Sequence, residues 1–276
     1  MGRSTRPRRV LVVAGTGTGI GKTWVATRLA EALTRRQVIV AARKLAQSFD
    51  PDEGATDADL LGRATGEEPE VVCPLHRWYP AAMAPPMAAE ALDHEPLLLT
   101  DLVAEVRESW PARAVDLGLV ELTGGPRSPM AHDADGVDVI AMLVPDVVVL
   151  VADAGRGTIN AVRQAVRDLK GIGIVVVLNR YDEADELHRR NRDWLVGRDL
   201  LTVVTDVDAL VGMVLDLLPS FSMSTGLPAA AGPARPVAGS EPPRFCPRCG
   251  RRLHVRETPD GWTARCQDHG PVDSGD

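Results

Sequence analysis

Short apolar runs alternate with stretches of helical periodicity along the first 219 residues. Apolar, β-branched runs predict strands, and apolar positions three or four residues apart predict helices. The expected strands are 10–14, 38–42, 117–122, 147–152, 174–178 and 201–204. The expected helices are 21–36, 56–64, 98–109, 159–169 and 207–218. Strands that are apolar throughout and separated by helices are typical of a mostly parallel sheet with helices on both faces, so we expect an α/β fold.

The composition of the chain changes near residue 220. Residues 220–244 are rich in Pro, Ala, Gly and Ser, which predicts a linker. Residues 245–276 hold three of the four cysteines and are expected to form a small module. Residues 1–8 are basic and are expected to be a disordered arm. The main domain is therefore expected to span residues 9–219.

Composition and charge limit the classes of protein that fit the chain. It has 45% hydrophobic and 25% charged residues, as globular proteins do, and its net charge of −7 argues against a nucleic-acid binder. The apolar runs are far shorter than the ~20 residues that span a bilayer, and no signal-peptide core follows the basic N-terminus. We therefore expect a cytoplasmic protein with no membrane partner. Cysteines in a reducing compartment favour metal binding over disulfides.

A glycine-rich loop, Gly-Thr-Gly-Thr-Gly-Ile-Gly-Lys-Thr at residues 15–23, joins the first expected strand to a helix. Such a turn presents backbone N–H groups to phosphates, the lysine adds charge at the β- and γ-phosphates, and the threonine hydroxyl can ligate Mg²⁺. The loop is one residue longer than the usual pattern, because Thr16 stands where that pattern requires glycine. We expect a P-loop NTPase-type fold that binds ATP through Gly17, Thr18, Gly19, Ile20, Gly21, Lys22 and Thr23.

Lysine is scarce in this chain. Of 31 basic residues 28 are arginine, and the lysines are Lys22, Lys44 and Lys170. A codon bias towards arginine explains the shortage without any function. Lys44 ends the second expected strand, whose carboxyl end faces the same crevice as the phosphate loop, so a compact point charge is expected there. Lys170 ends a helix, where the helix dipole is reason enough for its presence.

Candidate Mg²⁺ ligands lie at two further positions. Glu121 ends an apolar strand, where a carboxylate is costly unless a cation or a donor satisfies it. Asp57 and Asp59 open a helix, where an acid can also simply offset the helix dipole. Mg²⁺ bound with ATP usually takes one or two protein carboxylates. The residues alone leave the choice between Asp57 and Asp59 open.

Further motifs follow the loop in a definite order, and together they resemble the dethiobiotin synthetase family over roughly residues 10–218. The elongated loop itself resembles that family's form of the phosphate motif. The other matching segments are Lys44 with Ser48, Tyr79-Pro80 with the Met83 to Glu90 loop, Glu121 with Gly124-Gly125, the Gly157-Thr158-Ile159-Asn160 turn, and Asn179 after the fifth strand.

The resemblance implies ATP-dependent closure of a ureido ring on 7,8-diaminononanoate with CO2. It implies that Lys22 and Lys44 straddle the carbamate and γ-phosphate, and that Thr18 and Ser48 orient substrate and phosphate. Mg²⁺ would be held by Thr23, Asp57 and Glu121; Asp57 is preferred to Asp59 by its distance from Gly66. Asn179 would bind adenine, and the substrate would contact Ser48, Pro85 and Gly124. Family members are homodimers in which Gly157, Thr158 and Asn160 receive the substrate carboxylate from the neighbouring subunit.

The sequence departs from the family pattern near the implied substrate. Leu122 and Thr123 replace two small residues, Leu45 and Phe49 replace a proline and a glycine, and Ala161 stands where histidine is common. These changes keep a second hypothesis open. In it the chain is a regulatory or maturation ATPase that has lost or changed the substrate and grips a macromolecular partner through its C-terminal module.

The C-terminal module has two knuckle-like turns, Cys246-x-x-Cys249 and Cys266-x-x-His269, separated by sixteen residues. This spacing is typical of a zinc ribbon, in which four ligands hold one structural Zn²⁺. A redox Cys-x-x-Cys and an iron site are the alternatives. Because the synthetase reaction needs no such module, it suggests docking to a protein partner, and its charge of +1 from residue 220 onward gives little support for nucleic acid. Cys73 stands alone and is expected to be a buried apolar residue.

Overall fold

The computed structural model describes residues 5–52, 54–169, 171–218, 245–246, 253–258, 261–267 and 269–272. Three expectations fall outside the described residues: those for Lys170, for the linker 220–244 and for Cys249.

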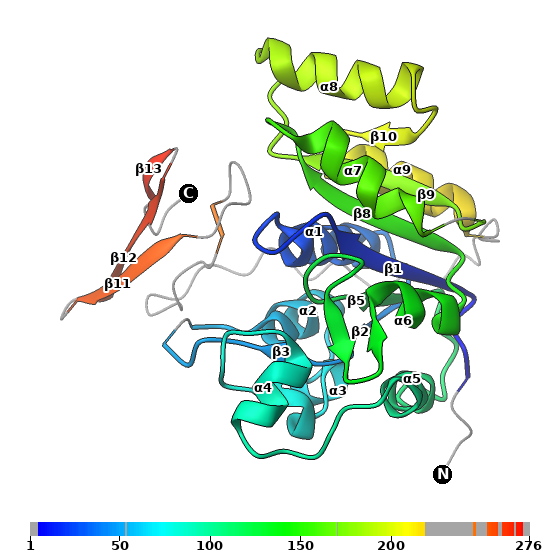
Figure 1. Ribbon diagram of the computed structural model, residues 1–276, viewed down its shortest axis with the longest axis vertical. Coiled ribbons are helices and arrows are strands. Elements are labelled where there is room, and N and C mark those ends of the chain that lie inside the picture. Colours follow the sequence, from blue (N-terminus) through cyan, green and yellow to red (C-terminus); the bar gives the residue numbers. More distant parts are fainter. Residues whose placement is uncertain are drawn as a thin grey trace, which may run out of the picture.

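Six parallel strands form the central sheet in the order β10-β9-β8-β1-β5-β2 (Figure 1). They are β1 (Arg9–Gly15), β2 (Val40–Lys44), β5 (Leu117–Glu121), β8 (Val147–Asp153), β9 (Ile174–Asn179) and β10 (Thr202–Val204). The apolar runs predicted each of them to within two residues. Because the strands are parallel, their carboxyl-terminal residues share one edge of the sheet. Lys44, Glu121, Asp153 and Asn179 all lie there.

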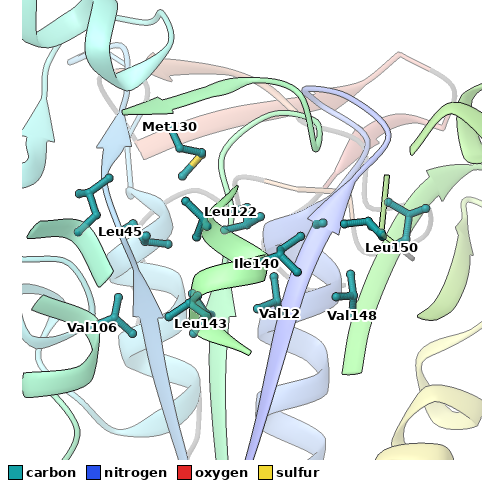
Figure 2. Close-up of a cluster of buried hydrophobic side chains, with 14 of the residues drawn as sticks. Val12, Leu45, Val106, Leu122, Met130, Ile140, Leu143, Val148 and Leu150 are labelled. Carbon is teal, nitrogen blue, oxygen red and sulfur yellow. The ribbon is translucent and has the colours of Figure 1, made fainter. Parts of the chain in front are cut away.

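Helices cover both faces of this sheet, as expected. On one face lie α1 (Lys22–Arg35), α2 (Asp57–Thr65) and α9 (Val207–Leu217). On the other lie α5 (Leu99–Glu108), α6 (Gly136–Leu143), α7 (Thr158–Arg167) and α8 (Glu186–Gly197). Successive side chains of β1 point to opposite faces of the sheet. Leu11 and Val13 therefore pack in the first core, under α1, α2 and α9, and Val12 packs in the second core, under α5 to α8. Figure 2 shows Val12 among Leu122, Ile140 and Val148 in the second core.

Short elements build the rim of the carboxyl edge. They are β3 (Gln47–Ser48), α3 (Pro69–Val72), η1 (Leu75–Arg77), β4 (Trp78–Tyr79), α4 (Pro85–Ala91), β6 (Pro129–Ala131) and β7 (Ala134–Asp135). Strands β3 and β4 pair in parallel, so Ser48 lies beside Tyr79. The Ser48 hydroxyl then donates to the Met83 carbonyl at 2.5 Å, which fixes the loop before α4 over the carboxyl edge.

Residues 5–8 differ from the expected disordered arm, because they pack on the domain. The Arg8 N–H donates to the Val115 carbonyl at 3.0 Å, and the Thr5 hydroxyl donates to the Ala112 carbonyl at 3.2 Å. Pro7 is buried beside Gly118, where a Cβ would lie 2.7 Å from the Pro7 ring. The absence of a side chain at Gly118 thus leaves room for Pro7 to pack there.

The C-terminal module forms a separate antiparallel sheet of β11 (His254–Thr258), β12 (Gly261–Cys266) and β13 (Gly270–Val272), with its own small core (Figure 1). Across the described ranges, no helix has both the length and the apolar character needed to cross a membrane.

Candidate functional site

The phosphate loop has the backbone that its glycines permit. Gly19 and Gly21 have φ values of 73° and 94°, in the left-handed region that other residues seldom adopt. Lys22 opens α1, and its Nζ folds back to donate to the Gly17 carbonyl at 2.9 Å. Burial, only partly offset by Glu121, lowers the pKa of Lys22 to about 8. Burial thus disfavours the charged form of Lys22, and a bound phosphate would stabilise that form.

Thr23, Lys44, Asp57 and Glu121 meet at the mouth of the loop, from α1, β2, α2 and β5. Lys44 Nζ lies 2.8 Å from Asp57 Oδ2 and 3.0 Å from Glu121 Oε1. Thr23 Oγ1 lies 3.0 Å from Asp57 Oδ1 and 2.8 Å from Glu121 Oε1, and its one proton can go to only one of them. The sequence placed these four residues at one crevice, and the structure brings them together.

The charges of this cluster are strongly coupled. Burial disfavours the ammonium of Lys44, but Asp57 and Glu121 outweigh burial and raise the pKa of Lys44. Burial raises the pKa of Glu121 against the opposing charge of Lys44. Glu121 Oε2 is buried and has no hydrogen-bond partner in the described part of the chain. An orphaned carboxylate oxygen beside a hydroxyl and a second carboxylate suits a hard cation such as Mg²⁺.

Asp57 and Asp59 have different tasks. The Thr56 N–H and hydroxyl lie 2.6 Å and 2.7 Å from Asp59 Oδ2, which completes a capping box at the start of α2. Asp57 instead faces Thr23 and Lys44. The geometry therefore puts Asp57 in the cluster and makes Asp59 the third-position acid of the capping box, in which Thr56 is the N-cap.

A cavity of about 350 Å³ opens over the cluster. It is lined by the phosphate loop, the 48–50 and 82–85 segments, the turn after β5, and Phe245 of the C-terminal module. Among the expected site residues that line it are Thr18, Gly19, Gly21, Lys22, Thr23, Ser48, Asp57, Pro85, Glu121 and Gly124.

A second cavity, of about 430 Å³, lies between α1, the end of β9 and the start of α9. Asn179 lines it and donates from Nδ2 to the Ile20 carbonyl at 2.8 Å. The side chains of Trp24, Arg28 and Tyr181 also line this space. Its closeness to the loop suits the base and ribose of a nucleotide whose phosphates bind the loop.

The expected carboxylate turn is not among the lining residues of either cavity. Gly157 has a φ of 82° and caps α7, and Thr158 is buried with an Oγ1 that has no partner among the described residues. Asn160 Oδ1 lies 3.4 Å from Gln164 Nε2. Within one chain, Gly157, Thr158 and Asn160 are thus not brought to the Lys44 cluster.

The departures from the family pattern divide into three groups. Leu45 and Leu122 are buried in the hydrophobic core (Figure 2). Neither residue lines the cavity. Phe49 and Thr123 line the cavity, so only these two bring added bulk to its wall. Ala161 is in α7, outside both cavities.

The C-terminal cysteines and histidine gather at one point. Cys246 Sγ and Cys266 Sγ each lie 3.6 Å from His269 Nδ1, and the three candidate ligand atoms lie within 4.8 Å of one another. Such a Cys/His group is compatible with a small zinc module. Cys73, in contrast, is buried in the main core, and burial raises the pKa of its thiol to about 12, so it is an unreactive apolar residue.

Sequence reasoning missed three residues at these sites. Ser128 lines the first cavity and its Oγ accepts from the Gly125 N–H at 2.8 Å. Arg180 lines the second cavity and reaches the phosphate loop. Phe245 comes to the first cavity from the C-terminal module. The one sequence signal for Arg180 is its position directly after Asn179. No sequence signal marks Ser128 or Phe245.

Comparisons with known proteins agree with this geometry. A protein family described as AAA domain matches residues 9–212. The ATP-dependent dethiobiotin synthetase BioD of Caulobacter vibrioides (strain NA1000 / CB15N) is 37% identical over 182 residues, which cover 63% of this chain and 82% of that protein. The corresponding enzyme of Anaeromyxobacter dehalogenans is 35% identical over 183 residues, covering 64% and 79%.

A different relative matches a shorter segment. The biotin synthase auxiliary protein of Mycobacterium tuberculosis (strain ATCC 25618 / H37Rv) is 53% identical over 57 residues, covering 20% of this chain and 72% of that protein. Among solved structures, the nucleotide-binding protein in complex with ADP from Archaeoglobus fulgidus has a TM-score of 0.41 and 14% identity, covering 80% of this chain and 93% of that one. That likeness is too weak to carry an argument.

Proposed function

Because the chain belongs to the AAA domain family and to the dethiobiotin synthetase family, we propose that it closes a ureido ring on 7,8-diaminononanoate with CO2 and ATP. One substrate amine captures CO2 as a carbamate, and the carbamate oxygen attacks the γ-phosphorus as ADP leaves. The second amine then attacks the carbonyl of the mixed anhydride and expels phosphate. The products are dethiobiotin, ADP and phosphate.

The observation that carries this proposal is a cavity lined by Lys22, Asp57 and Glu121, with the buried Lys44 paired to both of these carboxylates. Lys44 is 2% exposed and lies on the cluster, while Lys22 lies on the phosphate loop. Phosphoryl transfer requires alignment and charge neutralisation more than a protein nucleophile. Lys22 neutralises charge on the β- and γ-phosphates, and Lys44 holds the carbamate oxygen towards them. Thr18 and Ser48, which both line the cavity, orient phosphate and substrate.

Thr23, Asp57 and Glu121 would hold Mg²⁺, and the unpartnered Glu121 Oε2 supports that assignment. When bound, the ion supplies positive charge to the transferring phosphoryl group. Lys44 bridges both carboxylates and compensates their charge in the protein interior. Asn179 donates to the Ile20 carbonyl through Nδ2, so its Oδ1 can accept a hydrogen bond from the adenine amine.

The proposal includes a homodimer. Gly157, Thr158 and Asn160 lie away from their own chain's cavities, and the buried Thr158 Oγ1 has no partner in the described part of the chain. The N-terminus of α7 is suited to an anion, so it would receive the substrate carboxylate from the neighbouring subunit.

The experiment is release of ADP by the purified full chain with ATP, Mg²⁺ and bicarbonate. Supply of 7,8-diaminononanoate should raise ADP release and yield dethiobiotin in equal amount. ATP binding with no response to the diamine would overturn the proposal. ADP release that responds instead to a macromolecule would favour the regulatory ATPase.

We propose a second function for the C-terminal region, that of assisting biotin synthase. The 57-residue match to biotin synthase auxiliary protein fits in the region that follows residue 212, where the AAA domain match ends. Cys246, Cys266 and His269, with Cys249, would hold a Zn²⁺ that fixes this module. The partner that we propose for this module is therefore biotin synthase.

This second proposal is tested by adding the full chain to a biotin synthase. The unaltered chain should raise biotin formation, and Cys266→Ser should lose that effect while keeping diamine-dependent ADP release. His254→Ala, at an exposed position of β11, is the control and should behave as the unaltered chain. Equal stimulation by the Cys266→Ser chain, or none by the unaltered chain, would contradict it.

A further inference from the structure

Arg180 combines a rare backbone conformation with an enclosed guanidinium at the carboxyl edge of the sheet. It directly follows Asn179, the last residue of β9, and its φ is 60°. Residues with a long side chain seldom adopt this left-handed region. The side chain is 12% exposed. Such a conformation persists only where the surrounding contacts enforce it, and here those contacts are made by the Arg180 side chain.

The guanidinium of Arg180 connects two segments of the chain. Its Nη2 donates to the Gly19 carbonyl of the phosphate loop at 2.6 Å, and its Nη1 donates to Asp153 Oδ2 at the end of β8 at 2.7 Å. Asp153 is itself fixed, because its Oδ1 accepts from the Gly155 N–H at 2.9 Å. Arg180 therefore fastens the loop to a rigid end of the sheet.

Arg180 also lies between the two cavities. Gly19 lines the first cavity, and Arg180 and Asn179 line the second. A nucleotide with its phosphates in the loop and its base beside Asn179 spans this point. The Arg180 Nε is buried and has no partner in the described part of the chain, so the guanidinium is not fully satisfied by protein groups.

We propose that Arg180 is a positioning residue for the nucleotide. It acts through Gly19, by holding the phosphate loop in the shape that accepts phosphates, and Asp153 orients the guanidinium for this task. Without the contact between Arg180 and Gly19, the phosphate loop would have to become ordered when the nucleotide binds. The entropy lost in that ordering lowers the affinity for nucleotide. The inference rests on the nucleotide-binding part of the proposed function and is independent of the diamine.

The test measures binding of ADP with Mg²⁺ to the full chain by titration calorimetry. Arg180→Gly is the main variant, because glycine adopts the left-handed backbone without strain and so preserves the fold. We expect its dissociation constant for ADP to rise about tenfold, as the loss of a charged hydrogen bond does. Arg180→Lys keeps the charge but cannot reach both acceptors, so we expect an intermediate value.

The matched control is Arg163→Ala. Arg163 also pairs with an aspartate, since its Nη2 lies 2.7 Å from Asp199 Oδ1, but it is an exposed residue of α7 and is not bonded to the loop. Its dissociation constant should stay within about twofold of that of the unaltered chain, in the range of surface ion pairs. In turnover assays Arg180→Gly should raise the KM for ATP and leave the KM for the diamine unchanged. A purely structural loss would not separate the two constants.

A double-mutant cycle tests whether Asp153 acts through Arg180. Asp153→Asn alone should weaken ADP binding, and it should add nothing once Arg180 is glycine. ADP binding by Arg180→Gly within twofold of the unaltered chain would overturn the inference, and so would equal weakening in Arg163→Ala. If ADP binding depends on Arg180 but the diamine never stimulates turnover, the inference stands and the synthetase proposal falls.

Discussion

The ammonium of Lys44 lies 3.0 Å from Glu121 Oε1 at a place where the two side chains are 2% and 1% exposed. The same ammonium reaches Asp57 Oδ2 at 2.8 Å. One cation therefore compensates two carboxylates in the interior. This relationship gives Lys44 a structural role beside the catalytic role proposed for it, and the two roles can be separated by substitution.

Replacement of Lys44 by methionine should lower the free energy of unfolding by about 3–5 kcal/mol, because the buried Glu121 and the half-buried Asp57 lose their cation. Urea unfolding measures this change. Lys44→Arg keeps the charge but puts a broad planar fork into a space filled by an ammonium, so diamine-dependent turnover should be abolished with a smaller loss of stability. Lys170→Arg is the control and should be silent in both assays; normal turnover by Lys44→Arg would contradict the assigned role.

The two acids of α2 should behave differently when neutralised. Asp57→Asn should raise the Mg²⁺ concentration needed for half-maximal turnover and reduce maximal turnover, because Asp57 lies 3.0 Å from Thr23 Oγ1. Asp59→Asn should cost about 1 kcal/mol of stability by weakening the capping box, with little change in Mg²⁺ dependence. Turnover at varied Mg²⁺ and thermal unfolding of both variants decide this. The reverse pattern would place the ion at Asp59.

Nucleotide affinity should fall as pH rises through about 8, where Lys22 loses its proton. Burial lowers the pKa of Lys22 from its usual 10.5, so the protonated form that attracts phosphate dominates below about pH 8 and the neutral form above it. ATP titrations between about pH 6.5 and pH 9.5 measure the inflection. Lys22→Arg should remove it, since arginine does not deprotonate in this range. An inflection that persists in that variant would assign it to another group.

Removal of metal should act on the C-terminal module and spare the main domain. We expect one Zn²⁺ for each chain by elemental analysis, and its loss in Cys266→Ser and in His269→Ala, because both side chains belong to the Cys/His group. The unfolding of the α/β domain should be unchanged, since none of the module's described residues belongs to the two cores of that domain. A chain that holds no metal, or a variant that keeps it, would contradict this.

Much of the fold could be predicted because buried parallel strands are apolar along their whole length. The run at 147–152 has no alternation, and it became β8 with one residue added. The helix α8 was not predicted, because only Asn191 and Leu195 are buried in it. With so many charged residues, its sequence lacks the apolar periodicity from which a helix is predicted. The order of the strands is also absent from the sequence pattern, since pairing depends on contacts distant along the chain.

The site could be predicted where a residue type and a strand end coincide. Glu121 is such a case, because a carboxylate that closes an apolar strand needs a partner. Arg180 is not, because its place depends on a left-handed backbone that arginine seldom adopts. Phe245 depends on where a distant module lies, which no local pattern encodes.

Phe245 lines the cavity over the Lys44 cluster, and the next residue, Cys246, belongs to the Cys/His group. A single peptide bond thus joins a residue that lines one site to a candidate metal ligand of the other. Thermodynamic linkage then requires reciprocity: whatever factor metal binding applies to the affinity for a ligand in the cavity, that ligand applies to the affinity for metal. Metal affinity measured with and without a ligand in the cavity therefore gives the coupling free energy between the two sites.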